Sequence, residues 1–224
     1  MKEQLRKNLD KVIWNIERAR ITISEYHIVQ LVAVGKYSDE ESIKTLYELG
    51  QRAFGENQVQ QLQTRMENLE ELPLQWHMMG HLQSNKINKL VELRPSLFQS
   101  LDSLKLAEAL NTKLLEKNKK MNCLLQINAA NEESKSGVST EEAFDIYQQI
   151  SESCPQLKLK GVMSIGAHVD DKKLIQKSFE DSYKIYASLK KDNATICSMG
   201  MSNDYELAIK CGSNLVRIGS KIFK

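Results

Sequence analysis

Three kinds of residue along this 224-residue chain could do chemistry together: an amine, a guanidinium and small hydroxylated groups. Lys36 directly follows the apolar run 31–35 and precedes a capped helical pattern. A lysine at such a position is usually a surface residue whose stem lies on apolar surface. If its amine is instead partly desolvated at the end of a strand, it is free for Schiff-base chemistry with a carbonyl compound.

Small residues follow the last two apolar runs of the chain. They are Ser198-Met199-Gly200-Met201-Ser202 and Arg217-Ile218-Gly219-Ser220. Backbone N–H groups of small residues can approach an anion closely, and hydroxyls and a helix N-terminus add donors. Ser202 or Asn203 is expected to cap the helix that follows. The same pattern is common in ordinary caps and turns, so a phosphate site and a plain turn both stay open.

Arg217 and His77 are the other candidates. Arg217 lies two residues before Gly219, so strand alternation places both on the same face. An arginine that points into a barrel needs an anion, another acceptor or an internal salt bridge. His77, beside Trp76, is interpreted first as a core histidine with a satisfied hydrogen bond. The sequence shows no Ser/His/Asp set and no metal-ligand spacing.

Short apolar runs alternate with longer segments of helical periodicity along the whole chain. This alternation implies right-handed crossovers and a parallel sheet. Eight such repeats predict a single closed (β/α)8 barrel of TIM type, with residues 1–224 as one domain. The stretch from about 3 to 24 is expected to pack outside the barrel as an extra N-terminal helix. A doubly wound open sheet is the alternative, weakened by the lack of G-x-G-x-x-G after the first strand.

In a barrel of this kind, residues at the C-terminal ends of the strands line one mouth, where chemistry takes place. The expected strands are 31–34, 52–54, 75–79, 97–101, 123–127, 161–165, 195–199 and 215–218. The clearest helical segments are 39–49, 104–116, 140–151 and 172–189, with Ser38 and Ser139 as capping residues.

Composition limits the class of protein. Lys and Arg number 31 against 29 Asp and Glu, which gives no electrostatic case for nucleic acid or an anionic membrane as partner. No apolar run approaches the ~20 residues of a membrane span, and the start has no apolar signal core. The four cysteines are well separated and typical of buried, reduced thiols. We therefore expect a soluble, cytoplasmic protein.

Six separated motifs carry a family resemblance. They are AVGK ending at Lys36, FGENQVQ from Phe54, WHMMGHLQSNK from Trp76, QINAANEESKSG from Gln126, SMGMSNDYELAI from Ser198 and VRIGSKIF from Val216. With these motifs in order over essentially its whole length, the sequence resembles the pyridoxal phosphate homeostasis proteins (YggS/PROSC type). Those proteins are relatives of the barrel domain of bacterial alanine racemase.

The resemblance implies that Lys36 holds pyridoxal 5'-phosphate (PLP) as a Schiff base and that Arg217 faces the pyridine nitrogen. An arginine leaves that nitrogen without a proton, so the cofactor would have muted reactivity. The resemblance also implies a phosphate surrounded by Ser198, Met201, Ser202, Gly219 and Ser220, and a ring lined by Asn57, His77 and Met163.

The sequence departs from the family pattern at a few positions. Gly35 stands where Ser or Thr is common before the lysine, which is expected to remove a hydroxyl near the Schiff base. Asn214 and Ser220 replace commoner threonines, and Ser220 keeps a hydroxyl. The chain stops at Lys224, just after the last motif, so we expect a truncated or absent eighth helix and no C-terminal β-domain.

The leading hypothesis is a monomeric, non-enzymatic protein that holds PLP and delivers it inside the cell, with PLP-dependent apo-enzymes as partners. The alternative is a PLP-dependent amino-acid racemase, which needs proton donors on both faces of the ring. In the racemases the second is a tyrosine from a separate C-terminal domain. A third reading, an adaptor without cofactor, leaves Arg217 and the small-residue loops unexplained. Lys135, after the fifth strand, is a hypothetical second site for PLP.

Overall fold

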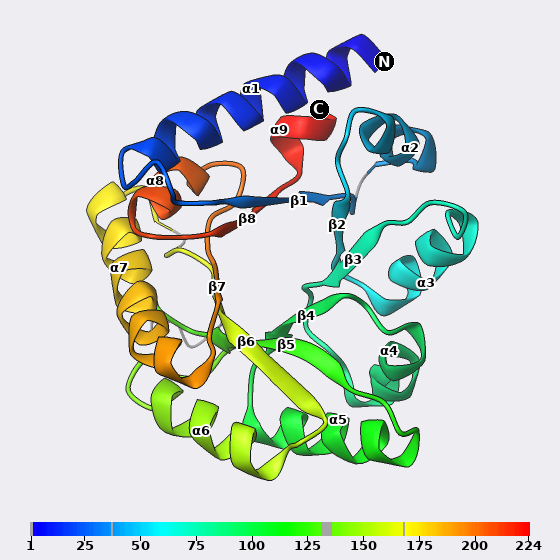
Figure 1. The fold of residues 1–224 in the computed structure, drawn as a ribbon, viewed down its shortest axis with the longest axis vertical. Helices are drawn as coiled ribbons and strands as arrows, with labels where there is room; N and C mark the ends of the chain where they lie inside the picture. The colour runs from blue at the N-terminus through cyan, green and yellow to red at the C-terminus, as the bar shows by residue number, and fades with distance from the viewer. Residues whose placement is uncertain (1, 37, 131–135, 168) are drawn as a thin grey trace.

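Eight parallel strands close into a barrel in chain order, each paired with the next and the last with the first (Figure 1). The computed structural model describes residues 2–36, 38–130, 136–167 and 169–224. The predicted single barrel with an extra N-terminal helix is confirmed. The strands are β1 (Gln30–Val34), β2 (Ala53–Glu56), β3 (Gln75–Met78), β4 (Leu97–Leu101), β5 (Met121–Ile127), β6 (Leu157–Ser164), β7 (Ile196–Ser198) and β8 (Leu215–Ile218).

Helices surround the barrel in the described part of the chain. They are α1 (Lys2–Ile21), α2 (Glu40–Glu48), α3 (Val59–Asn68), α4 (Ile87–Leu93), α5 (Leu104–Glu116), α6 (Ala143–Ser153), α7 (Lys172–Leu189), α8 (Tyr205–Lys210) and α9 (Ser220–Phe223), with short 3-10 turns η1 (Ser84–Lys86) and η2 (Lys190–Asp192). Buried apolar side chains form two separate clusters. The larger lies between strands and helices, and the smaller fills the barrel with residues such as Val32, Leu97 and Leu215.

Helix α1 covers the side of the barrel where the eighth helix is short. In Figure 1 it runs beside α8 and α9, and α9 has only four residues, as the sequence predicted. Its buried face repeats at helical spacing: Leu5, Leu9, Val12, Ile16 and Ala19. Asn8 Nδ2 donates to the carbonyls of Ile222 and Lys224 at 3.0 and 2.9 Å. Helix α1 therefore closes the layer that α9 leaves incomplete.

Three predicted helix caps are wrong. Asp39, not Ser38, caps α2, because its Oδ1 accepts from the Ser42 backbone N–H at 2.8 Å. Helix α8 begins after Asp204 rather than after Ser202 or Asn203. The first two errors have one cause: several capping-type residues stand in a row, and only the backbone path selects among them. Ser139 makes the contacts of a capping box with Glu142, through both its hydroxyl and the Glu142 N–H, but α6 begins only after Glu142, so Ser139 is not its N-cap either.

Strand β6 begins four residues before its predicted start. Residues 157–160 read Leu-Lys-Leu-Lys, whose charges hid the strand, yet they pair with β5 from Met121 onward. The register between β5 and β6 shifts after Cys123, close to Gly161, which has φ +139°. A Cβ at Gly161 would lie 1.9 Å from the Ile196 carbonyl oxygen, so only glycine fits this irregularity.

Candidate cofactor-binding site

A cleft of about 1350 Å³ opens at the C-terminal ends of the strands. Its walls come from the segments after β1, β6, β7 and β8 and from the starts of α7 and α8. Eight of the ten residues predicted for the site line it: Lys36, Asn57, Met163, Met201, Ser202, Arg217, Gly219 and Ser220. The other two, His77 and Ser198, lie behind its surface, and they are 4% and 0% exposed.

Lys36 follows β1 directly, and its side chain is exposed at the mouth. A surface lysine was the usual interpretation of this position and a partly desolvated amine the condition for Schiff-base chemistry; the side chain is exposed. The backbone here is anchored. Gly35 N–H donates to the Gly55 carbonyl at 3.1 Å, and the Lys36 carbonyl accepts from Gln61 Nε2 at 3.2 Å. The strand end is thus fixed while the Lys36 side chain is exposed at the cleft.

The position before Lys36 faces away from the mouth. A Cβ at Gly35 would lie 3.0 Å from Glu56 Oε1, 3.2 Å from Ser38 Oγ and 3.5 Å from Ile43 of α2. A hydroxyl at this position would therefore meet Glu56 on the helix side of the sheet. The expectation that Gly35 removes a hydroxyl near the Schiff base is wrong, because strand alternation turns neighbouring side chains to opposite faces.

Glu56 itself is an unusual buried acid. Its side chain is 0% exposed, and neither carboxylate oxygen has a hydrogen-bond partner in the described chain. Burial raises the pKa of Glu56 to about 7, against the opposing effect of the Arg65 guanidinium. Arg65 Nε lies 3.7 Å from Glu56 Oε1, and Arg65 also donates to the Ser38 carbonyl. A group that changes charge near neutral pH thus lies directly behind the Lys36 strand end.

The barrel interior contains a polar layer above its apolar cluster. Arg217 NH1 donates to Ser198 Oγ at 2.6 Å, and Ser198 Oγ donates to Gln99 Oε1 at 2.7 Å. Gln99 Nε2 lies 2.9 Å from His77 Nδ1. The contact between Ser198 on β7 and Gln99 on β4 joins strands that are not neighbours, so it crosses the interior. This chain of contacts starts at a residue that lines the cleft.

Arg217 is buried with neutral acceptors around it. Its NH2 donates to the Ser164 carbonyl at 2.9 Å, and the side chain forms no ion pair within the described chain. Desolvation lowers the pKa of Arg217 to about 10, which leaves it charged at neutral pH. These contacts use two of its five N–H donors. Asp204 attracts this cation without forming an ion pair with it, and a buried cation with unused donors favours a ligand that brings an acceptor atom.

Gln99 is the member of this layer that the sequence analysis missed. It is 0% exposed in the middle of β4, whose five residues are all buried. The signal was present, since Gln99 is a polar amide directly after Phe98 within a short, largely apolar run. It was overlooked because an amide has no titration or nucleophilic chemistry of its own. His77 does have its satisfied hydrogen bond as predicted, and burial lowers the pKa of His77 to about 4.

The loops after β7 and β8 meet at one wall of the cleft. Gly219 N–H donates to Ser202 Oγ at 3.3 Å, and Met201 N–H donates to Asp204 Oδ1 at 2.6 Å. Gly200 has φ +92°, and a Cβ there would lie 2.7 Å from Ala208. These contacts bring small, hydroxylated residues together around the end of β8. The cleft is lined by five cationic side chains against three carboxylates, a balance that suits an anionic ligand.

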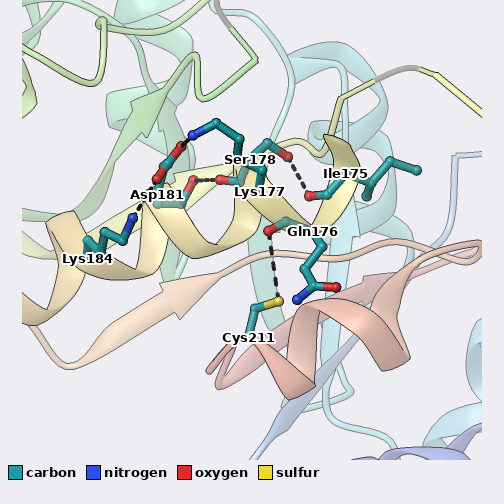
Figure 2. A network of polar contacts seen from close by, with 8 residues as sticks. Ile175, Gln176, Lys177, Ser178, Asp181, Lys184 and Cys211 are labelled. Atoms are coloured by element: carbon teal, nitrogen blue, oxygen red, sulfur yellow. Dashed lines mark hydrogen bonds and ion pairs between the residues drawn. The ribbon is translucent and has the colours of Figure 1, made fainter. Parts of the chain in front are cut away.

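The remaining wall is formed by the segment after β6 and the first turns of α7. Ser178 Oγ accepts from the Ala167 N–H at 3.3 Å and donates to the Ile175 carbonyl at 2.7 Å. Figure 2 shows Ser178 against Ile175, and Cys211 of the turn after α8 beside Gln176. Because Ala167, Ile175 and Gln176 all line the cleft, these contacts fix the shape of this wall.

The remaining expectations concern metals, thiols and membranes. Within the described residues no group of three or more His, Cys, Asp or Glu could hold a metal ion. All four cysteines are free, and Cys123, Cys154 and Cys197 are buried. Among the described helices, none is sufficiently long and apolar to span a bilayer. Lys135, the hypothetical second site, lies outside the described residues.

The donor set fits a phosphorylated aldehyde. The cleft is lined by an exposed lysine, a buried arginine with spare donors and a wall of small hydroxylated residues. A Cβ at Gly219 would lie 2.9 Å from the Val34 carbonyl, so glycine brings the β8 wall against the Lys36 strand end. Each group has a natural counterpart in an aldehyde, a ring nitrogen or a phosphate.

Comparison with known proteins agrees with this geometry. The family model described as "Alanine racemase, N-terminal domain" matches residues 8–224. The "Pyridoxal phosphate homeostasis protein" of Helicobacter pylori is 55% identical over 219 residues, which covers 98% of each chain. PipY of Synechococcus elongatus, solved with PLP bound, is 30% identical with a TM-score of 0.83, covering 98% of this chain and 100% of that one.

A Clostridium difficile alanine racemase shares the fold alone. It is 18% identical with a TM-score of 0.77, and the match covers 98% of this chain but 56% of the racemase. The similarity to the homeostasis proteins is higher in identity and covers nearly the full length of both chains. This chain belongs to the pyridoxal phosphate homeostasis protein family, within the larger family defined by the alanine racemase N-terminal domain.

Proposed function

We propose that this protein binds PLP in the cleft and holds it on Lys36 as part of intracellular PLP homeostasis, with little or no catalytic turnover. The observation that carries the proposal is that Lys36 and Arg217 line one cleft. The family membership and the PLP-bound relative support it. When bound, the cofactor supplies an aldehyde, with which the Lys36 amine condenses to a Schiff base as water leaves.

The protein's own residues would hold the cofactor at three points. Lys36 forms the covalent bond, and Arg217 presents N–H donors to the pyridine nitrogen from the barrel interior. Ser202, Gly219 and Ser220, with Met201, surround the phosphate. Asn57 and Met163 line the ring. Ser198 and His77 act from behind the surface, through Arg217 and Gln99 respectively.

Arg217 favours holding over catalysis. A guanidinium only donates hydrogen bonds, so it leaves the pyridine nitrogen unprotonated and the ring a weak electron acceptor. Cofactor held this way is kept from reacting while remaining releasable. Delivery to PLP-dependent apo-enzymes, a monomeric state and a cytoplasmic location are parts of the same proposal. The free cysteines suit a reducing compartment.

The covalent bond is tested by trapping. Protein mixed with PLP should turn yellow, lose its colour on borohydride reduction and carry the reduced adduct on Lys36 by mass spectrometry. Lys36→Ala should carry none. Lys86→Ala is the matched control, because Lys86 belongs to the same family motifs but lies outside the cleft, and it should label like the wild type. A wild-type protein that takes up no PLP contradicts the proposal.

The racemase alternative is tested separately. Alanine and other amino acids are incubated with the PLP-loaded protein, and loss of optical purity is followed against free PLP at the same concentration. We expect rates near that of free PLP. Rates well above it would make the protein a racemase.

A further inference from the structure

In the polar layer inside the barrel, the chemistry of the side chains decides which group donates each hydrogen bond and which accepts it. Arg217 can only donate, so Ser198 Oγ must accept from it at 2.6 Å. The single hydroxyl proton of Ser198 is then directed to Gln99, 2.7 Å away, which places the amide oxygen of Gln99 on that side. The Gln99 amide nitrogen consequently faces His77.

The same logic continues to the histidine ring. The Gln99 Nε2–H donor lies 2.9 Å from His77 Nδ1, which must therefore accept and carry no proton. A neutral imidazole without a proton on Nδ1 carries it on Nε2. Among the described residues, the hydrogen bond of the His77 ring is the one at Nδ1. Side chains from β8, β7, β4 and β3 thus form one chain of hydrogen bonds, the relay, in which each group donates to the next.

We propose that Gln99 is a positioning residue. Through Ser198 it receives the hydrogen-bond direction set by Arg217, and it holds His77 as the neutral Nε2–H tautomer behind the surface of the cofactor cleft. An amide suits this task because it has one donor side and one acceptor side in a rigid plane. Its low exposure keeps water from scrambling the direction. Arg217 would then act twice, once on the cofactor and once on the histidine.

The consequence for ligand binding rests on the proposed function. Because His77 lies behind the surface of the cleft, the relay would act on the cofactor through Arg217, which lines the cleft and is held by Ser198 through one of its N–H groups. The tautomer itself depends only on the protein. The two claims can therefore be tested separately.

The tautomer is read by nuclear magnetic resonance of full-length protein labelled with 15N-histidine and measured without added PLP. Long-range 15N–1H correlations distinguish the two neutral tautomers, and loss of one signal in His77→Gln assigns His77 among the four histidines. We expect the Nε2–H pattern in the wild type. An Nδ1–H or doubly protonated pattern at neutral pH would overturn the proposal.

Three variants test whether this chain of hydrogen bonds, and not local packing, sets the tautomer of His77. Gln99→Met keeps the side-chain length but removes the donor, so His77 should become a mixture of tautomers. Ser198→Ala does not touch His77, yet it should produce the same mixing by freeing the Gln99 amide to rotate. Gln99→Glu should move the proton to Nδ1 and shift His77 protonation to higher pH, because a carboxylate favours a charged neighbour.

The matched control is Gln126→Met, on the adjacent strand. Gln126 is also a buried glutamine, and its Nε2 donates to the Ser136 carbonyl at 2.8 Å outside the relay. His77 should keep its Nε2–H pattern in this variant. Mixing in Gln126→Met, or an unchanged His77 in Ser198→Ala, would show that no relay sets the tautomer.

PLP affinity tests the second claim, that the relay affects ligand binding. Gln99→Met and Gln99→Glu should bind PLP several-fold more weakly than Gln126→Met. Equal affinities alongside an altered tautomer would refute the consequence for the ligand. If the wild type binds no PLP at all, the proposed function fails while the tautomer result still stands.

Discussion

Glu56 and Arg65 form a buried pair of opposite charges that is not joined by a hydrogen bond. Arg65 Nε lies 3.7 Å from Glu56 Oε1, beyond hydrogen-bond distance, and both side chains are buried. Arg65 spends a donor on the Ser38 carbonyl instead. Glu56 is therefore attracted to a cation but receives no hydrogen bond from it, which is why burial dominates and its pKa rises to about 7.

Replacing Glu56 with glutamine should change how stability depends on pH. Folded Glu56 keeps its proton to about pH 7, whereas the ordinary value is 4.5, so the folded state binds more protons between these values. Stability then falls as pH rises through that window and is level above it. Glu56→Gln should match the wild type near pH 4 and exceed it near pH 8, by on the order of 1–3 kcal/mol.

The measurement is urea unfolding of both proteins at several pH values. The difference between them isolates Glu56 from His77, whose lowered pKa gives the opposite slope: stability is lost as pH falls from 6.5 towards about 4. A difference between Glu56→Gln and wild type that stays constant from pH 4 to pH 8 would contradict this assignment.

A hydroxyl at position 35 should reach Glu56. Gly35→Ser places an O–H donor beside Glu56 Oε1, and a hydrogen bond to the ionised form lowers the pKa of Glu56. The pH-dependent loss of stability should therefore shift to lower pH. Gly35→Ala adds the same Cβ without the hydroxyl and should leave the midpoint of that loss in place. Identical profiles for Ser and Ala would mean that the hydroxyl points elsewhere.

The serines of the β7 and β8 loops should distinguish PLP from pyridoxal. Ser202→Ala and Ser220→Ala each remove one hydroxyl from the wall assigned to the phosphate. A hydrogen bond to a charged group contributes about 1.5–3 kcal/mol, so PLP affinity should fall roughly 10- to 100-fold. Affinity for pyridoxal, which lacks the phosphate, should hardly change. Equal losses for both ligands would place the phosphate elsewhere in the cleft.

The docking of α1 should contribute to stability without touching the cleft. Asn8→Ala removes two hydrogen bonds to the end of α9, and we expect a loss of about 1–2 kcal/mol in urea unfolding. Gln63→Ala removes a half-exposed amide on α3 whose hydrogen bond, among the described residues, is to Glu67, and it should be nearly neutral. PLP binding should survive Asn8→Ala. A neutral Asn8→Ala would mean that the apolar face alone holds α1.

The sequence determined the barrel because its signals are local and repeated. Strands β4 and β8 and helices α5 and α7 have the bounds that hydrophobic periodicity predicted. Lys36, Arg217 and the small-residue loops could be assigned to one mouth because parallel strands bring their C-terminal ends together. Family motifs then gave these residues their expected roles.

Only the tertiary structure decided which way side chains turn and what they meet across the barrel. Gly35 faces Glu56 rather than the mouth, and Lys36 is exposed rather than partly desolvated. Gln99 joins Ser198 although 99 positions separate them along the chain. Such contacts depend on barrel closure and register, which place distant strands face to face, and no local pattern encodes the partner of a buried amide.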